Sequence, residues 1–112
     1  MSFPKRTADE AGGTTSPEEL IAAAHSSCYA MALSSEVAKA GGTPQALEIT
    51  AEVTLGQVDG APTITGIALT VRGEVDGLDA DGFEKAAQAA KVGCPVSKAL
   101  TGVDITLDAA LA

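Results

Sequence analysis

Two cysteines and a single histidine are the side chains of this chain best suited to covalent or metal chemistry. Cys94 precedes a proline at an expected helix start, so its sulfur would face unpaired N–H groups and the positive end of the helix dipole. That setting lowers a thiol pKa. Cys28 lies among alanines in the middle of a helical stretch, where desolvation and a net charge of −8 raise a thiol pKa. On these features alone, Cys28 also fits a buried small hydrophobic residue and Cys94 a simple helix cap.

His25 lies three residues before Cys28, and a His-x-x-Cys pair on one helical face suggests a metal ligand set. A four-coordinate zinc site would however need a carboxylate or a second chain, because the sequence has one histidine and two cysteines. A histidine in the core or at an interface is the simpler interpretation, and we predict no metal site. The sequence shows no glycine-rich phosphate loop and no Ser-His-Asp candidate set.

A long helix is expected to position Cys28. Ser16 is suited to cap it, Pro17 fits its first position, and the Gly41-Gly42 pair should end it after about Ala40. Between Glu19 and Glu36 the stretch has no charged residue. A helix that is apolar on all sides is typically buried, so we expect this one at the centre of the fold.

The rest of the chain alternates in ways that predict strands and further helices. Period-two patterns predict strands over 47–55, 64–75 and 103–107, with a hairpin-type loop over 56–62 and a bulge at Gly66. Helical spacing predicts a helix from Asp79 to Gly93 and a shorter turn or helix from Cys94 to Leu100. Hairpin-linked strands with segregated helices indicate an α+β fold, with an antiparallel sheet packed on the long central helix.

Composition limits the class of protein. A length of 112 residues predicts one domain over 1–112, with residues 1–15 as an irregular arm. An apolar fraction of 46% with only 3% aromatic residues indicates a globular core of small aliphatic side chains. The net charge of −8 argues against nucleic acid or an anionic membrane as a partner. Without a leader or an apolar run of roughly 18 residues, a soluble cytoplasmic protein is the expectation.

Two blocks of the sequence resemble the signature blocks of the osmotically inducible protein C family, the sister of the organic hydroperoxide resistance proteins. The blocks read P-E-E-L-I-A-A-A-H-S-S-C-Y-A-M-A-L over 17–33 and K-V-G-C-P-V-S-K-A-L over 91–100. Each contains one of the two cysteines, and the likeness covers about residues 13–112. Members of this family carry a β-meander before the catalytic arginine, whereas Arg6 lies near the start of this sequence. Two interpretations stay open: an N-terminally short form, or a start that is placed too late.

The resemblance implies a thiol peroxidase that reduces organic or lipid hydroperoxides. Cys28 corresponds to the peroxidatic cysteine, Cys94 to the resolving cysteine and Glu18 to the active-site glutamate. Arg6 is the candidate for the catalytic arginine. No bound cofactor is implied, and the disulfide would be reduced by lipoylated protein or another cellular dithiol. Two alternatives stay open: a catalytically silent domain that binds an apolar ligand or a partner, and a thiol redox sensor.

A homodimer with shared sites is expected from the distance between two candidate residues. Glu18 and Cys28 are ten residues apart, which is about 15 Å along a continuous helix and too far for a glutamate side chain. If two such helices pack antiparallel, Glu18 of one chain can approach Cys28 of the other.

Overall fold

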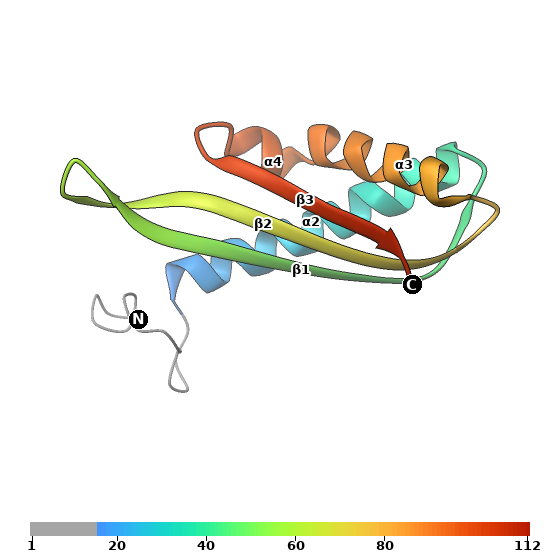
Figure 1. Cartoon of the computed structure of the whole chain (residues 1–112), viewed down its shortest axis with the longest axis horizontal. Coiled ribbons are helices and arrows are strands. Elements are labelled where there is room, and N and C mark those ends of the chain that lie inside the picture. Colours follow the sequence, from blue (N-terminus) through green and yellow to red (C-terminus); the bar gives the residue numbers. More distant parts are fainter. Residues whose placement is uncertain (1–15) are drawn as a thin grey trace.

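The computed structural model describes residues 16–112, which form a three-stranded sheet with three helices on one of its faces (Figure 1). The predicted irregular arm over 1–15 lies outside the described residues. In chain order the elements are α2 (Pro17–Lys39), β1 (Thr43–Val58), β2 (Ala61–Asp76), α3 (Ala80–Gly93), α4 (Pro95–Ala99) and β3 (Asp104–Leu111).

Helix α2 begins and ends where its sequence predicts. The Ser16 side chain accepts a hydrogen bond from the backbone N–H of Glu19 at 3.2 Å, which satisfies one of the free donors of the first turn. At the other end, Gly41 adopts a φ of 91°. The N–H groups of Gly41 and Gly42 donate to carbonyls in the last turn of α2, which is the Schellman pattern.

The strand order is β1-β2-β3, and the sheet is mixed. Strands β1 and β2 are antiparallel, as predicted, whereas β3 runs parallel to β2. The α+β class is confirmed, with the correction that one of the two strand pairings is parallel. The physical reason is the connection: α3 and α4 lie between β2 and β3 and carry the chain back along the sheet, as a parallel crossover requires.

The β1–β2 hairpin is longer than predicted. Asp59 and Gly60 have φ angles of 51° and 78°, which is typical of a two-residue type I′ turn. The predicted loop over 56–62 is therefore wrong, because both strands continue to this turn. The predicted bulge is confirmed beside Gly66: Thr54 pairs with Gly66 and Leu55 with Ile64, so Thr65 is skipped.

One face of the sheet and one stripe of α2 form the core, together with α3. The fully or nearly buried side chains of the core are Tyr29, Leu33, Val37, Ile67, Leu69, Val71, Phe83, Ala86, Ala87, Ala90 and Cys94. The Tyr29 hydroxyl donates to the carbonyl of Ala87 at 2.9 Å, which ties α2 to α3. The opposite face of the sheet is exposed, and threonine and charged residues alternate along it.

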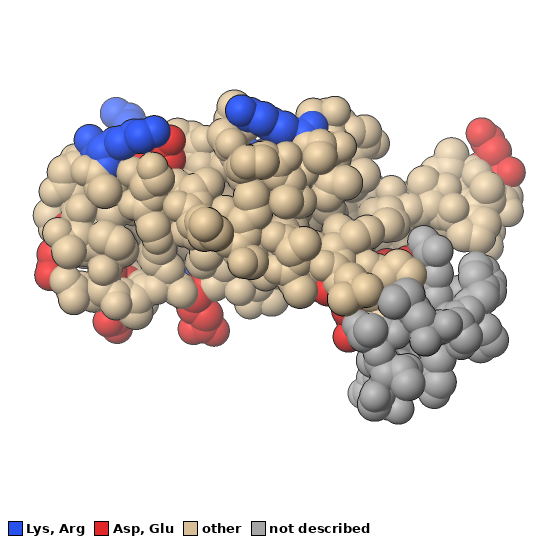
Figure 2. All heavy atoms as spheres, turned by 180° about the vertical axis from the view of Figure 1, so that it is seen from behind, with Lys and Arg blue, Asp and Glu red and all other residues tan. Residues whose placement is uncertain are grey.

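The outer face of α2 is open in the single chain. Burial is confined to one stripe, made of Glu18, His25, Tyr29, Leu33 and Val37. Met31 is 73% and Leu20 51% exposed. Figure 2 shows the molecule from behind, with most charged side chains toward its rim and a broad uncharged surface across the middle. The expectation that α2 is buried on all sides therefore holds for one face only of the single chain.

Candidate active site

The two cysteine side chains meet between α2 and α4, with 3.0 Å between Cys28 Sγ and Cys94 Sγ. Cys28 is half-buried and Cys94 is fully buried. The position of Cys94 is fixed by its backbone, because its N–H donates to Ala90 at the end of α3 and its carbonyl accepts from Lys98 in α4. Both thiols are free, so the structure places a reduced pair at a distance from which a disulfide could close.

The two thiols differ in acidity in the directions that the sequence predicts. Burial raises the pKa of the Cys28 thiol, and its contact with Cys94 raises it further. Burial also acts to raise the pKa of Cys94. Hydrogen bonding lowers the pKa of Cys94 by more than burial raises it, so the pKa is lowered overall. The groups responsible are the Cys28 thiol, the backbone and hydroxyl of Ser97 and the backbone of Val96. Cys94 is thus the more acidic of the pair.

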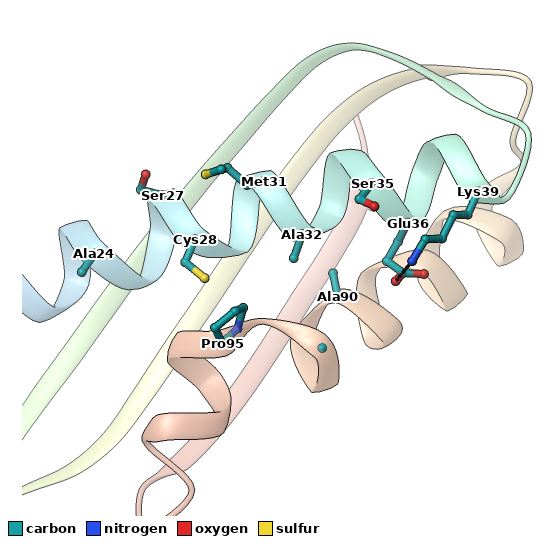
Figure 3. Close-up of a pocket in the computed structure, with 11 residues that line it drawn as sticks. Ala24, Ser27, Cys28, Met31, Ala32, Ser35, Glu36, Lys39, Ala90 and Pro95 are labelled. Carbon is teal, nitrogen blue, oxygen red and sulfur yellow. Dashed lines mark hydrogen bonds and ion pairs between the residues drawn. The ribbon is translucent and has the colours of Figure 1, made fainter.

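A groove of about 550 Å³ runs along α2 and exposes Cys28. Figure 3 shows Cys28 pointing from α2 toward Pro95 and Ala32 facing Ala90 across the groove. The far end carries an ion pair of 3.4 Å between Lys39 and Glu36. Its lining residues, most of them small or apolar, are Ala24, Ser27, Cys28, Met31, Ala32, Ser35, Glu36, Lys39, Ala90, Gly93 and Pro95.

His25 is a core histidine, as the simpler interpretation of the sequence held, and it has a partner that the sequence did not indicate. Its Nε2 lies 2.7 Å from Ser97 Oγ, across 72 positions of sequence. His25 is fully buried and Ser97 is 6% exposed. Burial lowers the pKa of His25, so the imidazole is neutral in the folded protein. No local pattern could have paired the two residues, because β1, β2 and α3 separate them in sequence.

The other two candidate residues lie elsewhere. Glu18 is buried in the first turn of α2. Because α2 is continuous to Lys39, Glu18 and Cys28 of one chain are separated by about 15 Å of helical rise. The structure therefore does not bring Glu18 to the thiol pair within one chain. Arg6 lies outside the described residues.

Within residues 16–112, no group of three or more His, Cys, Asp or Glu side chains is arranged to hold a metal ion. No helix in the same range is long and apolar enough to cross a membrane. The described site places two sulfur atoms in contact. One sulfur is open to a groove and the other is buried behind it.

A half-exposed thiol in contact with a buried one, on an α+β scaffold, is an arrangement that thiol–disulfide exchange requires. Residues 9–108 match the family of OsmC-like proteins, and the chain belongs to that family.

Similar proteins include the peroxiredoxin OsmC of Escherichia coli, which is 50% identical over 94 residues that cover 84% of this chain and 65% of that protein. The organic hydroperoxide resistance protein of Xanthomonas axonopodis pv. citri is 30% identical over 96% of this chain and 75% of its own length. The crystal structure of the organic hydroperoxide resistance protein OhrB of Bacillus subtilis superposes with a TM-score of 0.76 at 32% identity, covering 86% of this chain and 70% of that one. This chain thus spans slightly less than two thirds of the length of the E. coli relative.

Proposed function

We propose that the protein is a thiol peroxidase for organic hydroperoxides, with Cys28 as the peroxidatic and Cys94 as the resolving cysteine. The observation that carries the proposal is the 3.0 Å contact between a thiol that faces a groove and a thiol that is fully buried. The family membership supports the same reaction, as does the similarity to a peroxiredoxin and to an organic hydroperoxide resistance protein.

The proposed reaction has three steps. The Cys28 thiolate attacks one oxygen of the hydroperoxide, so that an S–O bond forms, the O–O bond breaks and the alkoxide leaves as an alcohol after taking up a proton. The Cys94 thiolate then attacks the Cys28 sulfur, and the hydroxyl of the sulfenic acid leaves as water. The sulfur atoms must approach by about 1 Å to reach the bond length of a disulfide. A dithiol finally reduces the disulfide and is itself oxidised.

The first step needs a positive charge near Cys28, because burial raises the pKa of this thiol and disfavours the reactive thiolate. We assign this role to Arg6, whose guanidinium would also hydrogen-bond the peroxide oxygens. Glu18 would hold the guanidinium in place. Replacing Arg6 by alanine should then slow the first oxidation of Cys28, while Lys5→Ala should leave it nearly unchanged.

The groove favours a bulky apolar substrate. Alanine, methionine and proline side chains line it beside Cys28, and its one ion pair lies at the far end. Each extra apolar group that the groove buries should strengthen binding, so we expect cumene hydroperoxide to react at least about tenfold faster than hydrogen peroxide. Comparable second-order rate constants for the two peroxides would contradict this assignment.

We further propose that the working unit is a homodimer in which two α2 helices pack antiparallel. The uncharged outer face of α2, with Met31 73% exposed, is the surface that a second copy would cover. In that arrangement, Glu18 of one chain approaches Cys28 of its partner. Mixing inactive Glu18→Ala and Cys28→Ser chains should restore about a quarter of the wild-type activity, because half of the dimers would contain one intact site. No regain of activity on mixing would refute the shared site.

The reductant and the location follow from the same chemistry. A lipoylated protein or another cellular dithiol would regenerate the thiols, and the reducing cytoplasm would keep the pair ready for the next peroxide.

A peroxide titration of free thiols separates the proposed enzyme from its alternatives. A silent ligand-binding domain would lose no thiols, whereas a redox sensor would be oxidised but would not turn over with excess dithiol.

A further inference from the structure

The contact between His25 and Ser97 continues to the active thiols. Ser97 Oγ lies 2.7 Å from His25 Nε2. Ser97 is also the third residue of α4, one turn after Cys94 at the N-cap, and its hydroxyl and backbone lower the pKa of the Cys94 thiol. Cys94 in turn lies 3.0 Å from Cys28. His25 and Ser97 thus form one buried polar pair and Cys94 and Cys28 a second, and the first turn of α4 links the two pairs. Neither the histidine nor the serine has a role in the reaction proposed above.

The burial of His25 decides which of its two ring nitrogens carries the proton. Nδ1 is buried and has no hydrogen-bond partner among the described residues. A buried N–H without an acceptor is more costly and rarer than a buried lone pair without a donor. The tautomer with the proton on Nε2 leaves only a lone pair at Nδ1, and it makes Nε2 the donor toward Ser97 Oγ. The hydroxyl proton of Ser97 is then free to point at another acceptor, such as the sulfur of Cys94 at the N-cap of the same helix.

Resting on the proposed peroxidase function, we propose that His25 is a positioning residue for the resolving cysteine. Its neutral imidazole donates Nε2–H to Ser97 Oγ and so directs the Ser97 hydroxyl proton onto Cys94 Sγ. A hydrogen bond donated to a thiolate stabilises the charged form, so the pair holds Cys94 ready to attack the oxidised Cys28. Resolution of the sulfenic acid, rather than its formation, is the step that this arrangement serves.

The other titratable groups around Cys94 do not replace this role. Cys28 and Tyr29 approach it from α2, and Glu84 of α3 acts on the Tyr29 hydroxyl. Burial raises the pKa of Tyr29, so the phenol remains neutral while the thiols titrate. Cys28 is consumed as the sulfenic acid before resolution begins. Among the contacts that lower the Cys94 pKa, the Ser97 hydroxyl is the one that a second buried side chain orients.

The direct test is the titration of Cys94 in Cys28→Ser protein, where ultraviolet absorbance of the thiolate reports a single sulfur. Cys94 is fully buried, so absorbance is preferable to alkylation. Adding His25→Leu should raise the Cys94 pKa by about one pH unit, which is a tenfold loss of thiolate below both pKa values. His25→Gln, whose amide N–H can reach the same hydroxyl, should restore most of the shift. Ser97→Ala should match His25→Leu, and the double variant should be no worse than either single one.

A second readout uses chains that retain both cysteines. After one equivalent of cumene hydroperoxide, the sulfenic acid of His25→Leu should decay about tenfold more slowly at neutral pH. This difference in decay rate should vanish at a pH above the Cys94 pKa of both the wild type and the variant. A loss of packing alone would slow the decay at every pH. An unchanged Cys94 titration in Ser97→Ala, or a shift there that His25→Leu lacks, would overturn the proposal. The titration does not depend on peroxidase activity, so failure of the proposed function would appear separately, as absence of Cys28 oxidation.

Discussion

Replacing Met31 by glutamate should separate the proposed homodimer into single chains. Met31 lies at the middle of the outer face of α2 with 73% of its side chain exposed in the single chain. Complete burial of a methionine contributes about 1.5–3 kcal/mol, so covering this exposed part contributes roughly 1–2 kcal/mol per chain. Because both chains of a twofold dimer carry the substitution, its cost enters the free energy of dimer dissociation twice. A glutamate at this position loses that contribution and buries two like charges as well.

The milder change Met31→Ala allows the magnitude to be measured. A loss of about 1 kcal/mol per chain is about 2 kcal/mol per dimer, which corresponds to a roughly 30-fold higher dissociation constant. Sedimentation velocity over a range of concentrations measures this constant. Val92→Ala is the matched control, because Val92 is equally exposed at 73% but lies on α3 and does not line the groove. The reasoning would be refuted if Met31→Glu left the dissociation constant unchanged, or if Val92→Glu raised it as much.

Three further outcomes follow from the described residues. Cys28→Ser should abolish peroxide consumption, whereas Cys94→Ser should complete one turnover and retain Cys28 as sulfenic acid, as mass spectrometry would show; the reverse pattern would exchange the two roles. Because burial raises the pKa of Cys28 and only the thiolate reacts, the rate constant for its oxidation in Cys94→Ser should rise with pH through neutrality, and a flat profile would contradict this. Gly73→Ala should lower the free energy of unfolding by about 1–3 kcal/mol in urea denaturation, since its added Cβ would lie 2.9 Å from the Phe83 ring; Gly102→Ala, with no atom within 4 Å, is the control and should change little.

Local signals were sufficient to predict the helices and the alternating strands. Ser16, Pro17 and the Gly41-Gly42 pair fix the ends of α2 through backbone chemistry that acts within a few residues. The position of the hairpin turn could also be predicted, because Asp59-Gly60 is a dipeptide typical of type I′ turns. The predicted loop over 56–62 was longer than this turn. The error came from treating the neighbouring residues as loop, although both strands continue to the turn.

Features that depend on how distant segments meet were not readable from local pattern. The direction of β3 depends on the path of the α3–α4 connection, and alternation is the same in parallel and antiparallel strands that bury one face. The opposite acidities of Cys28 and Cys94 could be predicted from their positions within their helices. Their contact, by contrast, was implied only by resemblance to a family. The hydrogen bond between His25 and Ser97 joins residues 72 positions apart, and neither segment has a local pattern that predicts it.

The measurement that tests the central proposal most directly is a titration of the reduced 112-residue chain with cumene hydroperoxide, followed by counting free thiols and mapping disulfides. One equivalent of hydroperoxide per chain should remove both thiols and form a single Cys28–Cys94 disulfide, with cumyl alcohol as the product. A dithiol should then restore both thiols and permit further turnover. Retention of both free thiols after the hydroperoxide is added, or oxidation confined to Cys94, would contradict the proposed function.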